Sequence, residues 1–173
     1  MKFPNRASLA RRGFSLIELI VVIMIMTVLA GVVIPRVVDH QKSARDARRL
    51  ADIKALQRVI DQYYLENGDY PPGDTGGWNR STDGAGFISV LVNEGYLTEP
   101  VEDPINDNTY HYRYRRYNQG QFGCVGDGRF YVLGVRNFES TDFANEHPGF
   151  FRCTGNDFST AFDYVTGGGA SFQ

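Results

Sequence analysis

An apolar run from Phe14 to Ile34 restricts the folding of this 173-residue chain more than any other feature. A helix needs about 20 consecutive apolar residues to cross the hydrocarbon core of a bilayer, and this run is long enough. Its fifth residue is Glu18, whose carboxylate would lie among lipid chains. An ionisable side chain there costs about 3 kcal/mol on insertion scales, so Glu18 indicates a function that depends on a specific partner.

Charge is distributed unevenly on the two sides of this run. The first thirteen residues carry four basic side chains and no acidic one, whereas the rest of the chain carries 14 basic and 20 acidic side chains. Basic residues keep their end of an apolar helix in the cytoplasm, so the sequence predicts an exported C-terminal part. That acidic part has no overall attraction for nucleic acid. Its two cysteines, Cys124 and Cys153, would lie in a compartment where a disulfide persists.

Three other kinds of N-terminal segment share a basic end and an apolar run. A secretory signal has an apolar core of about 7–15 residues before a cleavage site such as Val28-Leu29-Ala30, but this run is longer and contains Glu18. The pair Arg11-Arg12 is typical of twin-arginine export signals, yet no cofactor motif follows it. A plain membrane anchor explains the length of the run but not Glu18.

The residues around Gly13 carry a family resemblance. A short basic leader, then Gly13 and the sequence Phe-Ser-Leu-Ile-Glu-Leu-Ile, resembles the class III signal of type IV pilins and of the pseudopilins of type II secretion systems. In that family a prepilin peptidase cuts after the glycine and methylates the new amino terminus. The resemblance therefore implies cleavage between Gly13 and Phe14 and methylation of Phe14. It continues through Pro35 and residues 44–72, and then fades.

The resemblance also implies a role for Glu18. In the family, this acid is proposed to meet the amino terminus of the adjacent subunit, and opposite charges attract strongly in a low dielectric. Such a contact would favour one axial register during filament assembly. Two alternatives stay open: pairing with Phe14 of the same subunit, four residues away on the helix, and extension of the Glu18 side chain toward the lipid headgroups.

The expected fold class is α+β and pilin-like. A long N-terminal helix, whose first half spans the membrane, would pack on a small antiparallel β-sheet with a disulfide-closed C-terminal loop. The expected segments are a cleaved cytoplasmic leader (1–13), a transmembrane and filament-core helix (14–35), an amphipathic helix (36–66) and a globular β-rich head (67–173).

Past the membrane, the helix is expected to continue to about Glu66 before the stop signals Asn67-Gly68 and Pro71-Pro72. Pro35 would remove one backbone hydrogen bond and kink the helix. Apolar residues recur every three or four positions and predict a stripe that packs on a sheet: Leu50, Ile53, Leu56, Ile60, Tyr63 and Tyr64. Charged residues of mixed sign lie mostly elsewhere and predict either a solvated face or ion pairs between packed subunits: Asp39, Lys42, Arg45, Asp46, Arg48, Arg49, Asp52, Lys54, Arg58 and Asp61.

The head is expected to contain two strands and a decorated loop. Residues 73–86 predict a surface loop with Trp78 beneath it, and residues 87–91 predict a helical turn. Thr109–Tyr117 and Arg129–Val135 predict strands. The residues expected to face inward are Tyr110, Tyr112, Tyr114, Tyr131, Leu133 and Val135, whereas His111, Arg113 and Arg115 are expected to face outward. As in many pilins of the family, Cys124 and Cys153 are expected to join and to stabilise the fold by about 3.5 kcal/mol.

No catalytic arrangement is apparent, so the chain is not expected to be an enzyme. His40, His111 and His147 are far apart in sequence, and Gly123–Gly128 follows no dinucleotide-binding pattern. No cofactor is expected.

Calcium is the alternative to this expectation. Oxygen ligands suited to Ca²⁺ are gathered in one segment, at Glu102, Asp103, Asn106, Asp107 and Asn108. Major pseudopilins bind calcium in a C-terminal loop, but the usual ending of that loop is not recognisable in this sequence.

A nucleic-acid function is the second alternative. Arg113, Arg115 and Arg116 alternate with tyrosines, a combination that binds single strands through phosphate contacts and stacking, and competence pilins take up DNA. The acidic charge of the exported part favours an ordinary strand whose tyrosines pack inward.

The expected function is that of a structural subunit, a pilin that builds a helical filament with copies of itself. The alternatives are a type II secretion pseudopilin, a DNA-uptake pilin and a singly anchored periplasmic binding domain. The disulfide loop and the long tail after Phe138 favour the pilin, whereas the sequence GYLTEPVEDP at residues 95–104 favours the pseudopilin. The implied partners are the prepilin peptidase, an inner-membrane assembly platform with its ATPase, and lipid before assembly. The precursor is expected in the inner membrane, and the filament in the periplasm or at the cell surface.

Overall fold

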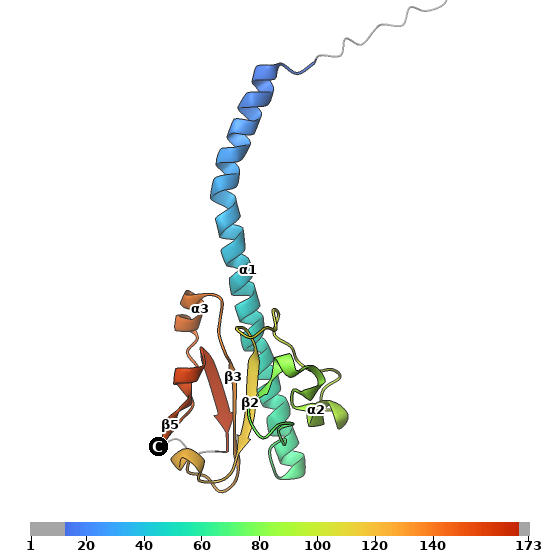
Figure 1. The fold of residues 1–173 in the computed structure, drawn as a ribbon, viewed down its shortest axis with the longest axis vertical. Helices are drawn as coiled ribbons and strands as arrows, with labels where there is room; N and C mark the ends of the chain where they lie inside the picture. Colours follow the sequence, from blue (N-terminus) through green and yellow to red (C-terminus); the bar gives the residue numbers. More distant parts are fainter. Residues whose placement is uncertain (1–12, 170–173) are drawn as a thin grey trace, which may run out of the picture. The chain divides into compact units, whose positions relative to one another are not determined.

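The computed structural model describes residues 13–169, and for residues 32–35 only the backbone. The helix α1 runs from Leu16 to Asn67 (Figure 1), ending one residue beyond the expected Glu66. The contacts divide the chain into two units, Met1–Asp39 and His40–Gln173. The expected leader lies outside the described residues apart from Gly13. The expected kink depends on Pro35, whose side chain also lies outside the described residues, so the kink stays a prediction.

The first unit contains the N-terminal part of α1. In length and composition, α1 is the one helix among the described residues that qualifies to cross a membrane. The side chains described between Phe14 and Gly31 are all exposed. An isolated helix with an apolar surface all round requires lipid or other helices around it.

The second unit is built on a small antiparallel sheet with the strand order β1-β2-β3-β6. The strands are β1 (Asn79–Arg80), β2 (Tyr112–Tyr117), β3 (Phe130–Val135) and β6 (Tyr164–Gly168), and a separate pair is formed by β4 (Arg152–Cys153) and β5 (Asn156–Asp157). Two short helices, α2 (Ser89–Asn93) and α3 (Thr141–Glu146), accompany 3-10 turns at Ser81–Gly86, Gln121–Gly123 and Phe158–Ala161. The long helix and small antiparallel sheet confirm the predicted α+β class.

The predicted apolar stripe of α1 packs into the hydrophobic core between α1 and the sheet. Five of its six residues are buried: Leu50, Ile53, Leu56, Ile60 and Tyr63. Tyr64 is 40% exposed, and its ring stacks on Tyr70 with centroids 4.4 Å apart. The stripe shares one hydrophobic cluster with the inner side chains of the sheet, which are Tyr112, Tyr114, Tyr131, Leu133 and Val135. This burial confirms the predicted inner row of the second strand and, in the first strand, Tyr112 and Tyr114; Tyr110 is only half-buried and precedes β2.

The other face of the sheet is more covered than expected. Phe130 and Val132 point away from α1, yet both are buried, in a second cluster with Phe151, Phe158 and Phe162. The predicted inner row of the second strand is thus correct, but the sequence did not predict that its outer row is buried as well. Every residue of β3 is buried because the C-terminal segment folds over its outer face, and a continuous apolar run is typical of a strand buried on both sides.

The start of β2 also differs from the prediction. The carboxylate of Asp107 accepts hydrogen bonds from the backbone of Thr109 and Tyr110, at 2.8 and 2.7 Å, and forms a turn there. The strand consequently begins at Tyr112 rather than at Thr109. His111, expected to face solvent, is buried, and its Nδ1 lies 3.0 Å from the carbonyl oxygen of Asp107.

Candidate assembly site and polar cluster

The expected cleavage site lies just before α1. Gly13 and Phe14 are exposed and have no regular secondary structure. Phe14 is 90% exposed, and a Cβ atom added to Gly13 would meet no atom within 4 Å. Both residues of the expected scissile bond are thus exposed, and cleavage there stays a prediction.

Glu18 lies in the first turn of α1, and its carboxylate has a partner in the uncleaved chain. Its Oε2 accepts a hydrogen bond of 2.9 Å from the backbone N–H of Ser15. The first four N–H groups of a helix lack intrahelical partners, and an acid near them also interacts favourably with the helix dipole. The nitrogen of Phe14 is here an uncharged peptide amide. Glu18 thus caps the helix before cleavage, a role that the sequence did not predict.

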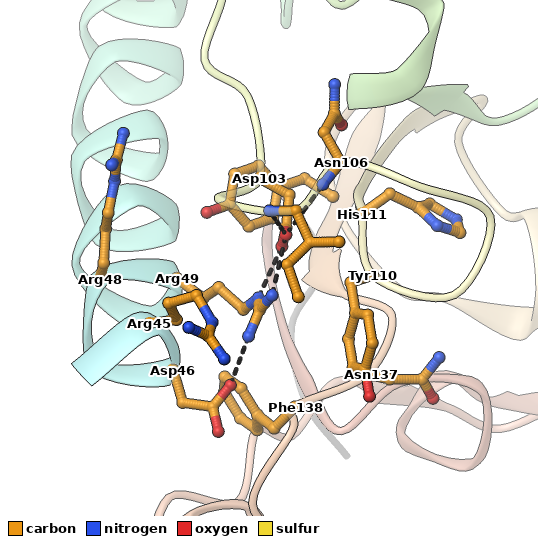
Figure 2. Close-up of polar contacts among 12 residues, drawn as sticks. Arg45, Asp46, Arg48, Arg49, Asp103, Asn106, Tyr110, His111, Asn137 and Phe138 are labelled. Carbon is orange, nitrogen blue, oxygen red and sulfur yellow. Dashed lines mark hydrogen bonds and ion pairs between the residues drawn. The ribbon is translucent and has the colours of Figure 1, made fainter. Parts of the chain in front are cut away.

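A buried ionic cluster joins α1 to the head (Figure 2). The guanidinium of Arg49, fully buried, donates to both oxygens of Asp103 at 2.6 and 2.9 Å. Its Nη1 also donates to Asp46 at 2.6 Å and to Glu139 at 2.8 Å. The sequence predicted that Asp46 and Arg49 lie on a solvated face or pair with another subunit. Both predictions are wrong for these two residues, because they pair within the chain. The sequence does contain a signal for their burial, since residues 46, 49, 50 and 53 lie on one helical face.

Electrostatics stabilise the charged forms in this cluster. Arg45 donates to both oxygens of Glu139 at 2.7 and 2.6 Å. This interaction, assisted by Arg49 against the effect of burial, lowers the pKa of Glu139 to about 2. Burial alone would lower the pKa of Arg49, but its bonds to Asp103 and Glu139 outweigh burial and raise it. The ring of Tyr110 lies 5.0 Å from the guanidinium of Arg49 and covers it.

Asp46 fixes the start of α3. Its carboxylate accepts hydrogen bonds from the backbone N–H groups of Glu139 and Ser140, at 3.0 and 2.9 Å. The Ser140 hydroxyl in turn caps α3 by accepting from the N–H of Phe143 at 3.3 Å. A single acid on α1 therefore holds a segment more than ninety positions later in the sequence.

The residues considered for calcium do not form a cluster of acids. The two oxygens of Asp103 bind Arg49, and Asp107 binds backbone amides of its own turn. Within residues 13–169, no group of three His, Cys, Asp or Glu side chains is arranged to hold a metal ion. His40, His111 and His147 belong to no such group. Calcium binding stays an untested alternative to the expectation of no cofactor.

The tyrosines considered for nucleic-acid stacking are buried. Tyr112 donates its hydroxyl hydrogen to Asp52 at 2.8 Å, and Tyr114 donates to the carbonyl oxygen of Pro71 at 2.7 Å. Tyr117 is also buried, beneath Arg115, whose guanidinium lies 4.9 Å from the ring. These rings pack in the protein, as expected for an ordinary strand.

The predicted disulfide is present. Cys124 and Cys153 are joined across 29 sequence positions, with their Cα atoms 4.7 Å apart. Both are buried in the second hydrophobic cluster, next to Tyr117, Phe130 and Phe158. Trp78 packs against Tyr117 and Phe162, as expected for a side chain tucked beneath its loop.

Comparison with known families decides the membership of the chain. A family described as "Type II secretion system (T2SS), protein G" matches residues 36–131, and a "Prokaryotic N-terminal methylation motif" matches residues 9–34. The chain belongs to the type II secretion system protein G family. The methylation motif covers Gly13, Phe14 and Glu18, and the family match covers Arg49 and Asp103 but not Glu139.

Curated relatives carry the same family name. The type II secretion system core protein G of Escherichia coli strain K12 is 39% identical over 122 residues, which cover 69% of this chain and 80% of the relative. The corresponding protein of Aeromonas hydrophila is 29% identical over 143 residues, covering 75% and 87%. That of Pectobacterium carotovorum is 38% identical over 126 residues, covering 65% and 70%. No solved structure gives a significant match. Members of the protein G family are structural pseudopilins, the alternative that the sequence left beside the pilin.

Proposed function

We propose that this chain is the major structural subunit of a type II secretion pseudopilus, processed between Gly13 and Phe14 and assembled through α1. The observation that carries the proposal is the placement of Glu18 in the first turn of an apolar helix, four residues from Phe14, within the matched methylation motif. The names of the relatives support the type of filament.

Cleavage would change the charges at the start of α1. The new amino group of Phe14 is a cation at the depth of Glu18, and opposite charges in a low dielectric attract strongly. A subunit that enters in the wrong register leaves a buried charge unpaired, which is costly. The pair of Glu18 with Phe14 of a neighbouring copy therefore selects one register. The apolar surface of α1 exchanges lipid for neighbouring helices during assembly.

The proposal includes partners and location. A prepilin peptidase cleaves and methylates the precursor in the inner membrane, whose N-terminus is cytoplasmic. An assembly platform and its ATPase drive subunits into a periplasmic filament. The role of the chain is structural rather than enzymatic.

The first experiment is mass spectrometry of the mature chain from secreting cells. We expect an N-terminal methylated Phe14 in the wild type. Gly13→Leu should leave the leader attached, because a Cβ atom at Gly13 meets no other atom and the change removes only peptidase recognition. The control is Gly31→Ala, where a Cβ atom also has free space and processing should continue. A mature terminus at any other residue contradicts the proposal.

The second experiment separates assembly from processing. Glu18→Ala should be cleaved and methylated, yet its filaments should be reduced at least tenfold by electron microscopy, since the buried amine has lost its partner. Glu146→Ala, which removes an exposed acid of α3 outside the apolar helix, is the control and should assemble normally. Normal filament growth of Glu18→Ala would remove its proposed role.

A type IV pilin remains the second candidate, and the disulfide between Cys124 and Cys153 is the observation in its favour. The two candidates differ in where the polymer is found. Deleting the gene should abolish secretion of enzymes through the outer membrane for a pseudopilin, but surface fibres for a pilin.

A further inference from the structure

Three arginines gather on the sheet face that points away from α1. Arg80 of β1 lies directly opposite Arg113 of β2 in the antiparallel register. Arg136 follows β3, and its backbone N–H bonds to the carbonyl oxygen of His111, at 3.0 Å. Because side chains alternate along a strand, Arg113 lies on the face opposite to the buried Tyr112 and Tyr114. Arg80, Arg113 and Arg136 are called the basic cluster below.

The described residues provide no ion-pair partner for the basic cluster. In the part of the chain that the structure describes, ion pairs involve other arginines, and none reaches Arg80, Arg113 or Arg136. The neighbouring acids Asp83, Asp107 and Asp163 accept hydrogen bonds from backbone N–H groups. Like charges directly opposite each other destabilise a sheet. Burial, assisted by Arg136 and Arg80, lowers the pKa of Arg113. The cluster therefore costs stability in the isolated subunit.

The guanidinium of Arg113 is held in position for a partner. Its Nε donates to Nε2 of His111 at 2.9 Å. Burial lowers the pKa of His111 and so favours the neutral ring that can accept this bond. Among the described residues, the two terminal nitrogens of Arg113 have no hydrogen-bond partner. A fixed guanidinium with free terminal nitrogens suits the planar geometry of a carboxylate.

A complementary group of acids lies in a loop on the other face of the sheet, the face that packs on α1. Glu94, Glu99 and Glu102 are exposed and form no ion pair within the described residues. Their segment, residues 94–102, is called the acidic loop below. It packs on the α1 side of the sheet (Figure 1), where Leu97 and Val101 contact the inner core and Tyr96 donates to Glu66 at 2.7 Å. Among the described residues, the acidic loop forms no ion pair with the basic cluster of its own chain.

We propose that the basic cluster of one subunit binds the acidic loop of a second copy of this chain. The inference rests on the proposed function, in which copies of the chain form a filament. Two different, complementary surfaces of a subunit make a heterologous contact, which leaves one free surface of each kind and continues from copy to copy. Complementary charges also steer subunits into register and disfavour wrong partners. This head-to-head contact is separate from the pairing of Glu18.

Cross-linking in assembled filaments tests the contact. The full chain carrying both Arg113→Cys and Glu99→Cys is expressed in secreting cells and treated with a short bis-maleimide. The native cysteines are joined in a disulfide and do not react. We expect a ladder of dimers, trimers and larger products, and no ladder from either single variant. The matched control pairs Arg113→Cys with Glu146→Cys, an exposed acid of α3 outside the acidic loop. Filaments without a ladder, or an equal ladder from the control, would overturn the proposal.

Charge exchange gives an independent measurement. Arg113→Glu and Glu99→Arg should each lower the yield of filaments about tenfold, and the double variant should restore it, because the pair is re-formed with reversed charges. Recovery no better than that of the single variants contradicts the contact. If the wild-type chain itself is not processed at Phe14 or does not polymerise, the proposed function fails instead. Tight binding of an oligonucleotide by the full wild-type chain in detergent, lost in Arg113→Glu, would reassign the cluster to nucleic acid.

Discussion

Arg49 is the residue on which the ionic cluster depends, because it is the partner that Asp46, Asp103 and Glu139 share. Arg49→Met keeps most of the side-chain volume but leaves buried carboxylates without a cation. We expect the free energy of unfolding to fall by about 3–5 kcal/mol. Urea unfolding of the detergent-solubilised chain, followed by the fluorescence of Trp78, measures this change.

Arg48→Met is the control for Arg49. Arg48 is the adjacent residue on α1, its side chain is 67% exposed, and its contact with Asp52 spans 3.7 Å. An exposed pair contributes about 0–1 kcal/mol, so this variant should unfold almost like the wild type. Equal effects of the two substitutions would show that the buried cluster does not stabilise the fold.

Glu139 gives the cluster a pH dependence. Its pKa is lowered from 4.5 to about 2, first by the hydrogen bond from Arg45. A carboxyl group of this kind stabilises the fold fully above its unfolded pKa, and the stabilisation is lost as the pH falls through the folded pKa. The window therefore lies between about pH 4.5 and 2, and the effect amounts to about 3 kcal/mol.

The comparison of wild type with Glu139→Gln isolates this effect. Asp52 and Asp61, whose pKa values are raised by burial, contribute in the opposite direction but are present in both proteins. The stability difference between the two proteins should be largest near pH 7 and disappear toward pH 2. A difference that is constant with pH would contradict the role assigned to Glu139.

At the scale of elements, Gly134 shows how closely β3 and β6 are packed. A Cβ atom at this position would lie 2.6 Å from the carbonyl oxygen of Tyr164 and 2.8 Å from the ring of Phe162. Gly134→Ala should therefore lower the free energy of unfolding by about 1–3 kcal/mol through overpacking. Gly128→Ala, where a Cβ atom meets no other atom, is the control and should unfold like the wild type. Thermal unfolding by near-ultraviolet circular dichroism would measure both, and unchanged stability of Gly134→Ala would contradict this packing.

The elements that the sequence predicted are those with a strong local pattern. The helix α1 has a clear apolar period, and β2 alternates tyrosine with arginine, so both were predicted to within a few residues. The strand β6 and the helix α3 were not predicted. Gly167 and Gly168 in β6 weaken any strand pattern, and α3 is only six residues long. Both depend on contacts with distant segments, such as β3 and Asp46, which no local pattern reveals.

The candidate site was predicted to a similar extent. Gly13, Phe14 and Glu18 form a motif that can be recognised in sequence, and the disulfide followed from the family resemblance. The ionic cluster was missed because Asp46 and Arg49 resemble a solvated charged face. Their burial depends on Asp103 and Glu139, which lie 54 and 90 positions from Arg49 in the sequence. The basic cluster was partly visible in the arginines of β2, but Arg80 and Arg136 reach it through sheet pairing.

At the scale of the whole molecule, the charge asymmetry and the disulfide predict where the head resides before processing. In the orientation proposed above, basic residues keep the N-terminus in the cytoplasm, so membrane insertion alone should export the head. The bond between Cys124 and Cys153 then forms in an oxidising compartment, whereas cytosolic thiols stay reduced. Orientation and disulfide formation should therefore not depend on cleavage at Gly13.

The uncleaved Gly13→Leu chain tests this order of events. Its two cysteines should be oxidised, so a maleimide reagent should add to them only after reduction of the denatured protein. As a control, a chain that lacks residues 1–35 stays in the cytoplasm and should react without reduction. Two free thiols in the membrane-bound Gly13→Leu chain would place the head in the cytoplasm, and export would then have to follow cleavage. Oxidised thiols would mean that cleavage serves filament assembly, because the head has already crossed the membrane when the amine of Phe14 is formed.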